Sequence, residues 1–214
     1  MLEESTTTEA KVSRAAAQRL SQYLRVTGTL VNRGGLVSST ELADAVGVSA
    51  AQVRRDLAAL GHLGQRGVGY DADGLTSAIR KRLGVDRRWR AVLVGVGHLA
   101  KALVKYRGLG EHGFDLVGLY DSAPGVIGSS IGGLKVEAVT SLASRVKKLR
   151  AELGIITVPA ESAQSVADAL VSAGLKGLMN FAPVRLKVPS KVQVISVDLA
   201  IQLQQLAFRV HFGE

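Results

Sequence analysis

Two glycines that follow a short apolar run, Gly95 and Gly97, have the spacing of a phosphate-binding turn. In the stretch VLVGVGHLAKAL (92–103), the apolar run predicts a buried strand and the residues after Gly97 predict a helix. Gly95 permits a tight turn, and Gly97 lets the backbone approach a pyrophosphate, whose charge the helix N-terminus favours. Ala100 takes the third position of the pattern, where close packing of the helix on the strand requires a small residue. The stretch therefore predicts a dinucleotide-binding turn.

A carboxylate, Asp121, ends the next apolar run, FDLVGLYD (114–121). At the end of that strand it could accept hydrogen bonds from both hydroxyls of a ribose, and it would repel a 2′-phosphate. This position favours NAD over NADP as the dinucleotide. The alternative is that Asp121 only caps the end of its strand.

The sequence offers no obvious acid or base to accompany this turn. The histidines are His62, His98, His112 and His211, and none of them ends a strand in the second half of the expected sheet. A nicotinamide dehydrogenase needs such a group beside the substrate carbon, and no separate substrate domain is evident. We therefore expect no catalytic residue, and an NAD-dependent oxidoreductase with a helical appendage remains the alternative.

The elements that would position this turn begin near Trp89, where short β-rich apolar runs start to alternate with helical stretches. The expected strands are AVLVGV, FDLVGLYD, LGIITVP, LKGLMNFAP and VQVISVD, and the helices between them include HLAKALVKY, VTSLASRVKKLR and AESAQSVADALVSAG. This alternation predicts an α/β fold with a Rossmann-like parallel sheet. We assign residues 85–196 to that domain, after a boundary within KRLGVDRRWR (81–90).

Residues 14–84 have a different, mainly helical pattern that predicts a winged helix-turn-helix domain. Ser38 with Glu41, and Ser49 with Gln52, have the spacing of capping boxes that begin two successive helices. The stretch ELADAVGVSAAQVRRDLAAL is therefore predicted to form a helix, a short turn and a second helix. The glycine-rich stretch GHLGQRGVGYD that follows predicts a hairpin wing.

The second of these helices has one buried and one exposed face. Val53, Leu57 and Leu60 recur with helical spacing and form the expected buried stripe, which leaves Gln52 and Arg55 exposed. Gln suits adenine and Arg suits guanine, whereas a flanking arginine meets phosphate more readily. The expected DNA-contacting residues are Ser49, Gln52, Arg54, Arg55, Arg66 and Gly67. The alternative is a small helical bundle with a solvated arginine pair.

Composition supports an anionic partner and excludes several classes of site. The 214 residues carry a formal net charge of +9, and nine Lys or Arg lie between Arg54 and Arg90 against four Asp. The chain has no cysteine, which excludes disulfides, thiolate metal sites and cysteine nucleophiles. No signal peptide or membrane-length apolar run is present, so we expect a cytoplasmic protein. Residues 1–13 are expected to be disordered.

Residues 197–214 contain an apolar stripe with helical spacing. Leu199, Leu203, Leu206 and Val210 fall on one face of the expected helix. The stripe could pack on the sheet of its own chain or on a second copy. A DNA-binding protein with two-fold symmetry favours the second copy.

Taken together, these stretches resemble the Rex family of redox-sensing transcriptional repressors. The matching motifs are RLSQYLRV, VSAAQVRRDLAALGHLGQRGVGYD, VLVGVGHLAKAL, LVSAGLKGLMNFAP and VDLAIQLQQLAF. The resemblance implies a homodimer with winged-helix and Rossmann domains and an exchanged C-terminal helix. It also implies repression at a palindromic DNA operator with NAD⁺ bound or without cofactor, and release by NADH. No membrane or metal partner is implied.

The resemblance also implies roles for particular residues. The cofactor-binding set would be Gly95, Val96, Gly97, His98, Leu99, Ala100, Tyr106, Asp121, Thr157, Pro159, Asn180 and Phe181. Tyr106 would report on the nicotinamide and contact Asp198 of the other subunit, and Asp198 would also be the switch partner of Arg25 from the N-terminal domain. A scaffold with a vestigial nucleotide site remains a third possibility. The chain departs from the family pattern at Ala59, Leu60, Ala100, Ala123, Val126 and Leu199.

Overall fold

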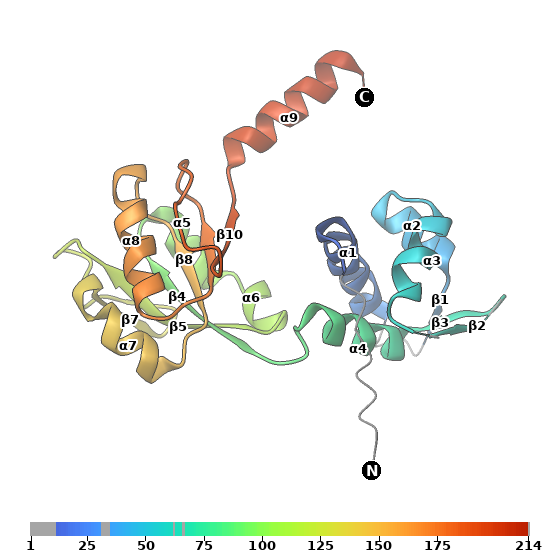
Figure 1. The fold of residues 1–214 in the computed structure, drawn as a ribbon, viewed down its shortest axis with the longest axis horizontal. Coiled ribbons are helices and arrows are strands. Elements are labelled where there is room, and N and C mark those ends of the chain that lie inside the picture. Colours follow the sequence, from blue (N-terminus) through green and yellow to red (C-terminus); the bar gives the residue numbers. More distant parts are fainter. Residues whose placement is uncertain (1–11, 31–34, 62, 66, 214) are drawn as a thin grey trace, which may run out of the picture. The chain divides into compact units, whose positions relative to one another are not determined.

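The computed structural model describes residues 12–30, 35–61, 63–65 and 67–213. The chain forms two compact units, Met1–Arg87 and Arg88–Glu214, which are shown in Figure 1. The stretch expected to be disordered falls outside the described residues except for its last two positions. The second of these, Ser13, accepts the Ala16 N–H at 3.2 Å at the start of the first helix.

The first unit is a winged helix-turn-helix, as predicted. Its helices are α1 (Arg14–Leu30), α2 (Ser39–Val46), α3 (Ala50–Ala58) and α4 (Ala72–Leu83), and its strands are β1 (Leu36–Val37), β2 (Gly64–Gln65) and β3 (Gly69–Asp71). The strands form a small antiparallel sheet in the order β1-β3-β2. Leu20, Tyr23, Leu42, Val53 and Leu57 are buried at its helical core.

The caps of α2 and α3 explain where these helices begin and end. Ser38 and Glu41 form the expected capping box, and Gly47 ends α2 in the left-handed conformation with φ 74°. The Ser49 hydroxyl accepts the Gln52 N–H at 3.1 Å. The Gln52 side chain does not complete a second capping box, contrary to prediction, because it bonds to Asp56 instead.

The second unit contains a seven-stranded sheet in the order β10-β9-β8-β4-β5-β7-β6, parallel except for β6. The strands are β4 (Trp89–Val94), β5 (Phe114–Asp121), β6 (Ser130–Ile131), β7 (Leu134–Ala138), β8 (Leu153–Ile156), β9 (Gly177–Asn180) and β10 (Gln193–Ser196). Each of the five predicted apolar runs overlaps one of these strands, although β4 begins two residues before its run, at Trp89. Strands β6 and β7, which extend the sheet beyond β5, were not predicted.

Helices pack on both faces of this sheet, which is why residues 91–94 of its central strand are all apolar and buried. They are α5 (His98–Lys105), α6 (Gly108–Glu111), η2 (Val139–Ser141), α7 (Leu142–Leu149) and α8 (Ala160–Ser172). Val92 and Val94 of β4 are buried in a cluster with residues of α7 and α8. The alternate residues Ala91 and Leu93 are buried with Ala100 of α5. Because side chains alternate along a strand, both faces of β4 are covered.

The last helix, α9 (Leu199–Phe212), presents its apolar side chains to solvent in this single chain. It has no buried residue among those that the structure describes. Leu199, Leu203 and Val210 of the predicted stripe are 65%, 66% and 76% exposed. Asp198 begins the helix, and its Oδ1 accepts the N–H groups of Ala200 and Ile201. No helix within the described part of the chain is long and apolar enough to span a membrane.

Candidate functional site

The predicted glycine turn connects β4 to α5 with the conformation that the motif requires. Gly95 has a φ of +95°, and a Cβ there would lie 2.6 Å from Val158 Cγ1 and 2.8 Å from the Thr157 carbonyl carbon. Only glycine meets both conditions without strain. Gly97 has an ordinary φ of −81° and is the N-cap of α5. A Cβ at Gly97 would meet no protein atom within 4 Å, so the space beside it is open.

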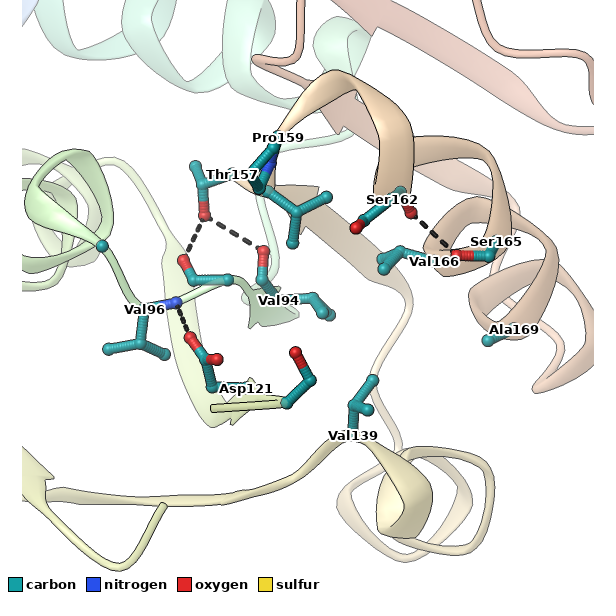
Figure 2. Close-up of a pocket in the computed structure, with 14 residues that line it drawn as sticks. Val94, Val96, Asp121, Val139, Thr157, Pro159, Ser162, Ser165, Val166 and Ala169 are labelled. Atoms are coloured by element: carbon teal, nitrogen blue, oxygen red, sulfur yellow. Dashed lines mark hydrogen bonds between the residues drawn. The ribbon is translucent and has the colours of Figure 1, made fainter. Parts of the chain in front are cut away.

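Thr157, which directly follows β8, fixes the carbonyl side of this turn. Its hydroxyl lies 2.7 Å from the Gly95 carbonyl oxygen and 3.1 Å from that of Val94, as Figure 2 shows. Its backbone N–H also donates to the Val94 carbonyl at 2.9 Å. The two carbonyl groups are therefore held toward Thr157. No side chain of the described residues caps α5, so its first N–H groups are available to an anionic ligand.

Asp121 lies on the other side of the turn, at the end of β5. Its Oδ2 accepts the Val96 N–H at 2.6 Å (Figure 2), and its Oδ1 accepts the Ala123 N–H at 2.8 Å. The carboxylate thus fixes the turn from the β5 side while it faces the pocket. The alternative interpretation of Asp121 as a strand-end cap describes its Ala123 contact, but not its position in the pocket wall.

These groups line a pocket of about 710 Å³ at the carboxyl ends of β4, β5 and β8. This is the point where the strand order reverses about β4, which is where open parallel sheets bind ligands. The volume lies within the usual range for small-molecule sites. Six predicted cofactor residues line the pocket, namely Gly95, Val96, Gly97, Asp121, Thr157 and Pro159.

The other six predicted cofactor residues lie outside this lining. His98, Leu99 and Ala100 form the first turn of α5, where Ala100 is fully buried. Tyr106, Asn180 and Phe181 are also absent from the lining. Lining residues that were not predicted are Val94, Ser122, Val139, Val158, Ser162, Ser165, Val166 and Ala169. The signal that could have identified most of them is their position in the fold, since they lie just after β5 or β8 or in the first turns of α8.

Asn180 and Tyr106 have local contacts that the sequence did not indicate. The buried Asn180 amide donates to the carbonyls of Ala182 and Val184 and accepts the Ala182 N–H, so it supports the loop after β9. The Tyr106 ring is 59% exposed and lies over Gly108, where a Cβ would overlap the ring. The absence of a side chain at Gly108 therefore sets the position of Tyr106.

In the first unit, α3 has most of the faces that its sequence predicted, but Leu60 lies beyond the end of the helix, and both Leu60 and Gln52 are half-buried. Val53 and Leu57 are buried, whereas Arg54 and Arg55 are exposed. The Arg54 guanidinium donates to the Ser39 hydroxyl at 3.0 Å, which links α3 to the first residue of α2. Gly67 lies in the turn between the wing strands with φ +81°. Arg66 falls outside the described residues.

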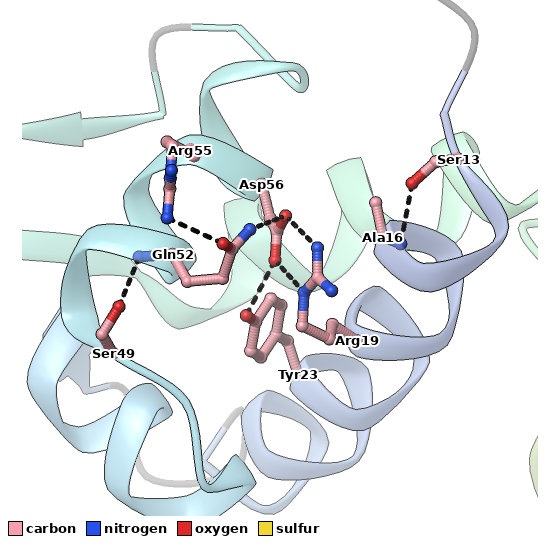
Figure 3. Close-up of polar contacts among 8 residues, drawn as sticks. All are labelled: Ser13, Ala16, Arg19, Tyr23, Ser49, Gln52, Arg55 and Asp56. Carbon is pink, nitrogen blue, oxygen red and sulfur yellow. Dashed lines mark hydrogen bonds and ion pairs between the residues drawn. The ribbon is translucent and has the colours of Figure 1, made fainter.

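Behind this exposed face, the buried carboxylate of Asp56 joins α3 to α1. It accepts two hydrogen bonds from Arg19, at 2.6 and 2.8 Å, and one from the Tyr23 hydroxyl at 3.0 Å (Figure 3). Burial opposes its ionisation, but the hydrogen bonds from Arg19, Gln52 and Tyr23 hold the pKa of Asp56 below its ordinary value. Burial and the bond to Asp56 raise the pKa of Tyr23 to about 12. The sequence did not indicate this role of Asp56, which counts there only as one of the four Asp between Arg54 and Arg90.

The described residues contain no group of three or more His, Cys, Asp or Glu side chains suited to a metal ion. The polar side chains of the pocket are the Asp121 carboxylate and the hydroxyls of four residues, Ser122, Thr157, Ser162 and Ser165. Together with the glycine turn, they form a surface suited to the hydroxyl and phosphate groups of a nucleotide.

Comparisons with known proteins match both units. Residues 86–184 match the family described as "CoA binding domain", and residues 11–58 match "Putative DNA-binding protein N-terminus". A "Redox-sensing transcriptional repressor Rex" of Carboxydothermus hydrogenoformans is 45% identical over 94% of this chain and 97% of its own length. The protein of the same name from Syntrophomonas wolfei is 43% identical over 92% and 95%.

Solved structures of similar proteins also match this chain over both units. The crystal structure of RSP in complex with β-NAD⁺ and operator DNA has a TM-score of 0.89 and 34% identity, covering 95% of this chain and 94% of that one. RSP in complex with β-NADH has a TM-score of 0.83 and 33% identity, covering 94% and 95%. A further structure of RSP is described as a Rex-family repressor and has a TM-score of 0.85.

Proposed function

Because the chain belongs to the Rex family of redox-sensing transcriptional repressors, we propose that it is a DNA-binding repressor that senses the NADH/NAD⁺ ratio. It binds its operator with NAD⁺ or without cofactor, and NADH releases it. The observation that carries this proposal is that one similar protein, aligned over 95% of this chain, was crystallised with both NAD⁺ and operator DNA. Such a repressor acts in the cytoplasm, where its DNA and cofactor pool lie.

In this proposal the pocket of the second unit holds NAD(H). The pyrophosphate lies against Gly95, Val96 and Gly97 at the N-terminus of α5, where backbone N–H groups and the helix dipole favour its charge. Asp121 accepts the hydroxyls of the adenine ribose. A methyl group on Gly97 would meet no protein atom within 4 Å, and this open space supports the close approach of the pyrophosphate.

The exposed face of α3 and the wing form the DNA-binding surface. Helix α3 enters the major groove, with Arg55 and Gln52 toward the bases and Arg54 toward phosphate. Ser49 at the N-terminus of α3 and Gly67 in the turn of the wing add contacts to the DNA backbone, and Arg66, which lies outside the described residues, stays a predicted contact. The arginines that follow, from Arg80 to Arg90, add to the positive charge of the same stretch of chain.

We infer that the cofactor is sensed and not consumed, so that the protein is not an enzyme. The relatives that match the whole chain are named repressors. A dehydrogenase would also need an acid or base next to the nicotinamide. The polar side chains of the pocket are one carboxylate, already engaged with two backbone N–H groups, and hydroxyls.

The proposed active form is a homodimer in which α9 packs on the partner subunit. The exposed stripe of Leu199, Leu203, Leu206 and Val210 supports this, since a contiguous exposed apolar patch is typical of a surface that packs against another protein. Two-fold symmetry matches a palindromic operator, because each winged helix then binds one half-site. Asp198, at the start of α9, accepts two N–H groups of its own helix through one oxygen. In the proposed switch its carboxylate pairs with Arg25 or Tyr106 according to the nicotinamide state.

Gel retardation with and without cofactor tests the proposed function. The duplex is a palindrome selected from random DNA by the purified full chain. NADH is expected to weaken binding by about 5- to 150-fold, which corresponds to the usual 1–3 kcal/mol of coupling between two sites, and NAD⁺ is expected not to weaken it. Absence of specific DNA binding, together with NADH oxidation by a carbonyl substrate, would identify an oxidoreductase. Calorimetry that detects no NADH binding would identify a scaffold.

Replacing Gly108 with alanine is expected to change the NADH response and leave operator binding without cofactor intact. The new methyl group overlaps the Tyr106 ring, and this exposed ring can move away without unfolding the unit. The NADH concentration for half-release should shift by about 5-fold or more if Tyr106 belongs to the switch. Gly110→Ala is the matched control, because its Cβ meets no atom within 4 Å in the same helix. A Gly108→Ala protein with an unchanged NADH response would remove Tyr106 from the switch.

A further inference from the structure

Both polar ends of the Gln52 side chain are already engaged in the absence of DNA. Its amide nitrogen donates to Asp56 Oδ1 at 2.8 Å, and its amide oxygen accepts from the Arg55 guanidinium at 2.8 Å. The three residues occupy positions i, i+3 and i+4 of α3, where side chains of one helix meet. Figure 3 shows this chain of contacts from Arg55 through Gln52 to Asp56 and on to α1.

Asp56 dictates which end of the Gln52 amide faces outward. An ionised carboxylate can only accept hydrogen bonds, and its two oxygens offer about four lone-pair sites. Four donors occupy Asp56, two from Arg19 and one each from Tyr23 and Gln52. The amide nitrogen of Gln52 must therefore face Asp56, and its oxygen must face Arg55. Because Asp56 is buried at 7% exposure, water does not compete strongly for these sites.

This orientation limits what each side chain can do at a base pair. A glutamine that recognises adenine uses its amide N–H and its oxygen together, and in this structure one of the two N–H groups and one of the two oxygen lone pairs are already bonded within α3, which holds the amide toward Asp56 and Arg55. Arg55 keeps more of its donors free. Its guanidinium carries five N–H donors, and the bond to Gln52 uses one of them. Two further donors are enough for the bidentate contact with guanine O6 and N7.

We propose that Asp56 is a positioning residue that orients Gln52 to support Arg55, so that Arg55 recognises a guanine and Gln52 recognises no base by itself. This inference rests on the proposed DNA-binding function and specifies its half-site. The hydrogen bonds that align the specificity-determining arginine thus begin at Arg19 and Tyr23 of α1, which precede Asp56 by 37 and 33 residues in the sequence.

Base analogues that lack the N7 acceptor test this assignment. Each guanine and each adenine of the selected half-site is replaced in turn by its 7-deaza analogue, and the affinity of the full chain is measured at fixed salt without NADH. One guanine is expected to be sensitive, with a loss of about 10-fold, equivalent to about 1.4 kcal/mol. That sensitivity should disappear in Arg55→Ala and fall to about 2-fold or less in Gln52→Ala. Asp56→Asn should behave like Gln52→Ala.

Tyr23→Phe is the matched control, since it removes one donor from Asp56 Oδ2 and leaves the Oδ1 contact with Gln52. It should lower stability but keep the guanine sensitivity. An adenine whose deaza analogue weakens the parent protein about 10-fold but not Gln52→Ala would overturn the inference. Full guanine sensitivity in Gln52→Ala would also overturn it. Parent protein that binds no duplex specifically would instead overturn the proposed function itself.

Discussion

Replacing Gly97 with alanine is expected to weaken NADH binding by about 100-fold or more, equivalent to about 2.7 kcal/mol. The added methyl group would occupy the space that a pyrophosphate needs for its approach to the backbone. The protein itself can accept the change, because Gly97 has a φ of −81° and its Cβ would meet no atom within 4 Å. Calorimetry measures the loss of binding, and thermal unfolding should show an unchanged midpoint.

Alanine substitutions at two other glycines serve as controls for this result. Gly95→Ala should lose both binding and stability, because its φ is +95° and its Cβ would lie 2.8 Å from the Thr157 backbone. Gly110→Ala should retain both, since its Cβ is also free of contacts and it does not line the pocket. NADH binding at parental affinity by Gly97→Ala would place the pyrophosphate somewhere other than this turn.

Replacing Asp56 with alanine is expected to destabilise the N-terminal unit by about 3 kcal/mol. Removal of one partner of a buried ion pair typically costs about 3–5 kcal/mol, and Arg19, whose side chain is 24% exposed, can recover part of its hydration. The Tyr23 hydroxyl has no such recovery because Tyr23 is fully buried. Hydrogen exchange of α1 and α3 amides isolates this unit from the rest of the chain. Asp44→Ala, at an exposed position of α2, is the control and should cost less than about 0.5 kcal/mol.

The pH dependence of the stability of the N-terminal unit distinguishes the effect of the Asp56 charge from the effect of its side-chain packing. The pKa of Asp56 is lowered in the folded state relative to its ordinary value of 3.8. The contribution of ionised Asp56 to the free energy of unfolding is therefore fully present above the ordinary pKa. It is lost as the pH falls through the lower pKa of the folded state. Protection of α3 amides should decrease below about pH 4 in the parent protein. A parent and an Asp56→Ala protein with parallel pH profiles would contradict this account.

Among the strands that the sequence predicted, β4 and β8 are largely buried on both faces, whereas the edge strand β10 is mostly exposed. Residues 91–94 of β4 form a continuous apolar run because α5 covers Ala91 and Leu93 while α7 and α8 cover Val92 and Val94. The missed strands β6 and β7 lie beyond β5 in a glycine-containing stretch of mixed polarity. Ser130 and Lys135 pair there at the edge of the sheet, where hydropathy gives little signal.

The residues of the candidate sites fall into two groups. Some could be predicted from the local sequence, and others have contacts that depend on tertiary packing. Gly95, Gly97 and Asp121 could be predicted because spacing and strand ends carry the information. Asp56 could not, since its partners on α1 come close only after the helices pack. The same packing explains the incorrect second capping box, because the Gln52 nitrogen donates to the charged Asp56 and the Gln52 oxygen, which would have accepted the Ser49 N–H, accepts from Arg55 instead.

The two backbone N–H groups held by Asp121 also determine which nicotinamide pool the protein can follow. A carboxylate offers about four lone-pair sites, and Val96 and Ala123 occupy two of them. Two sites remain, one for each hydroxyl of an unmodified ribose. A 2′-phosphate would bring negative charge and no donor to this position. The repressor should therefore respond to the reducing equivalents of catabolism, carried by NADH, and stay unaffected when the biosynthetic NADPH pool rises or falls.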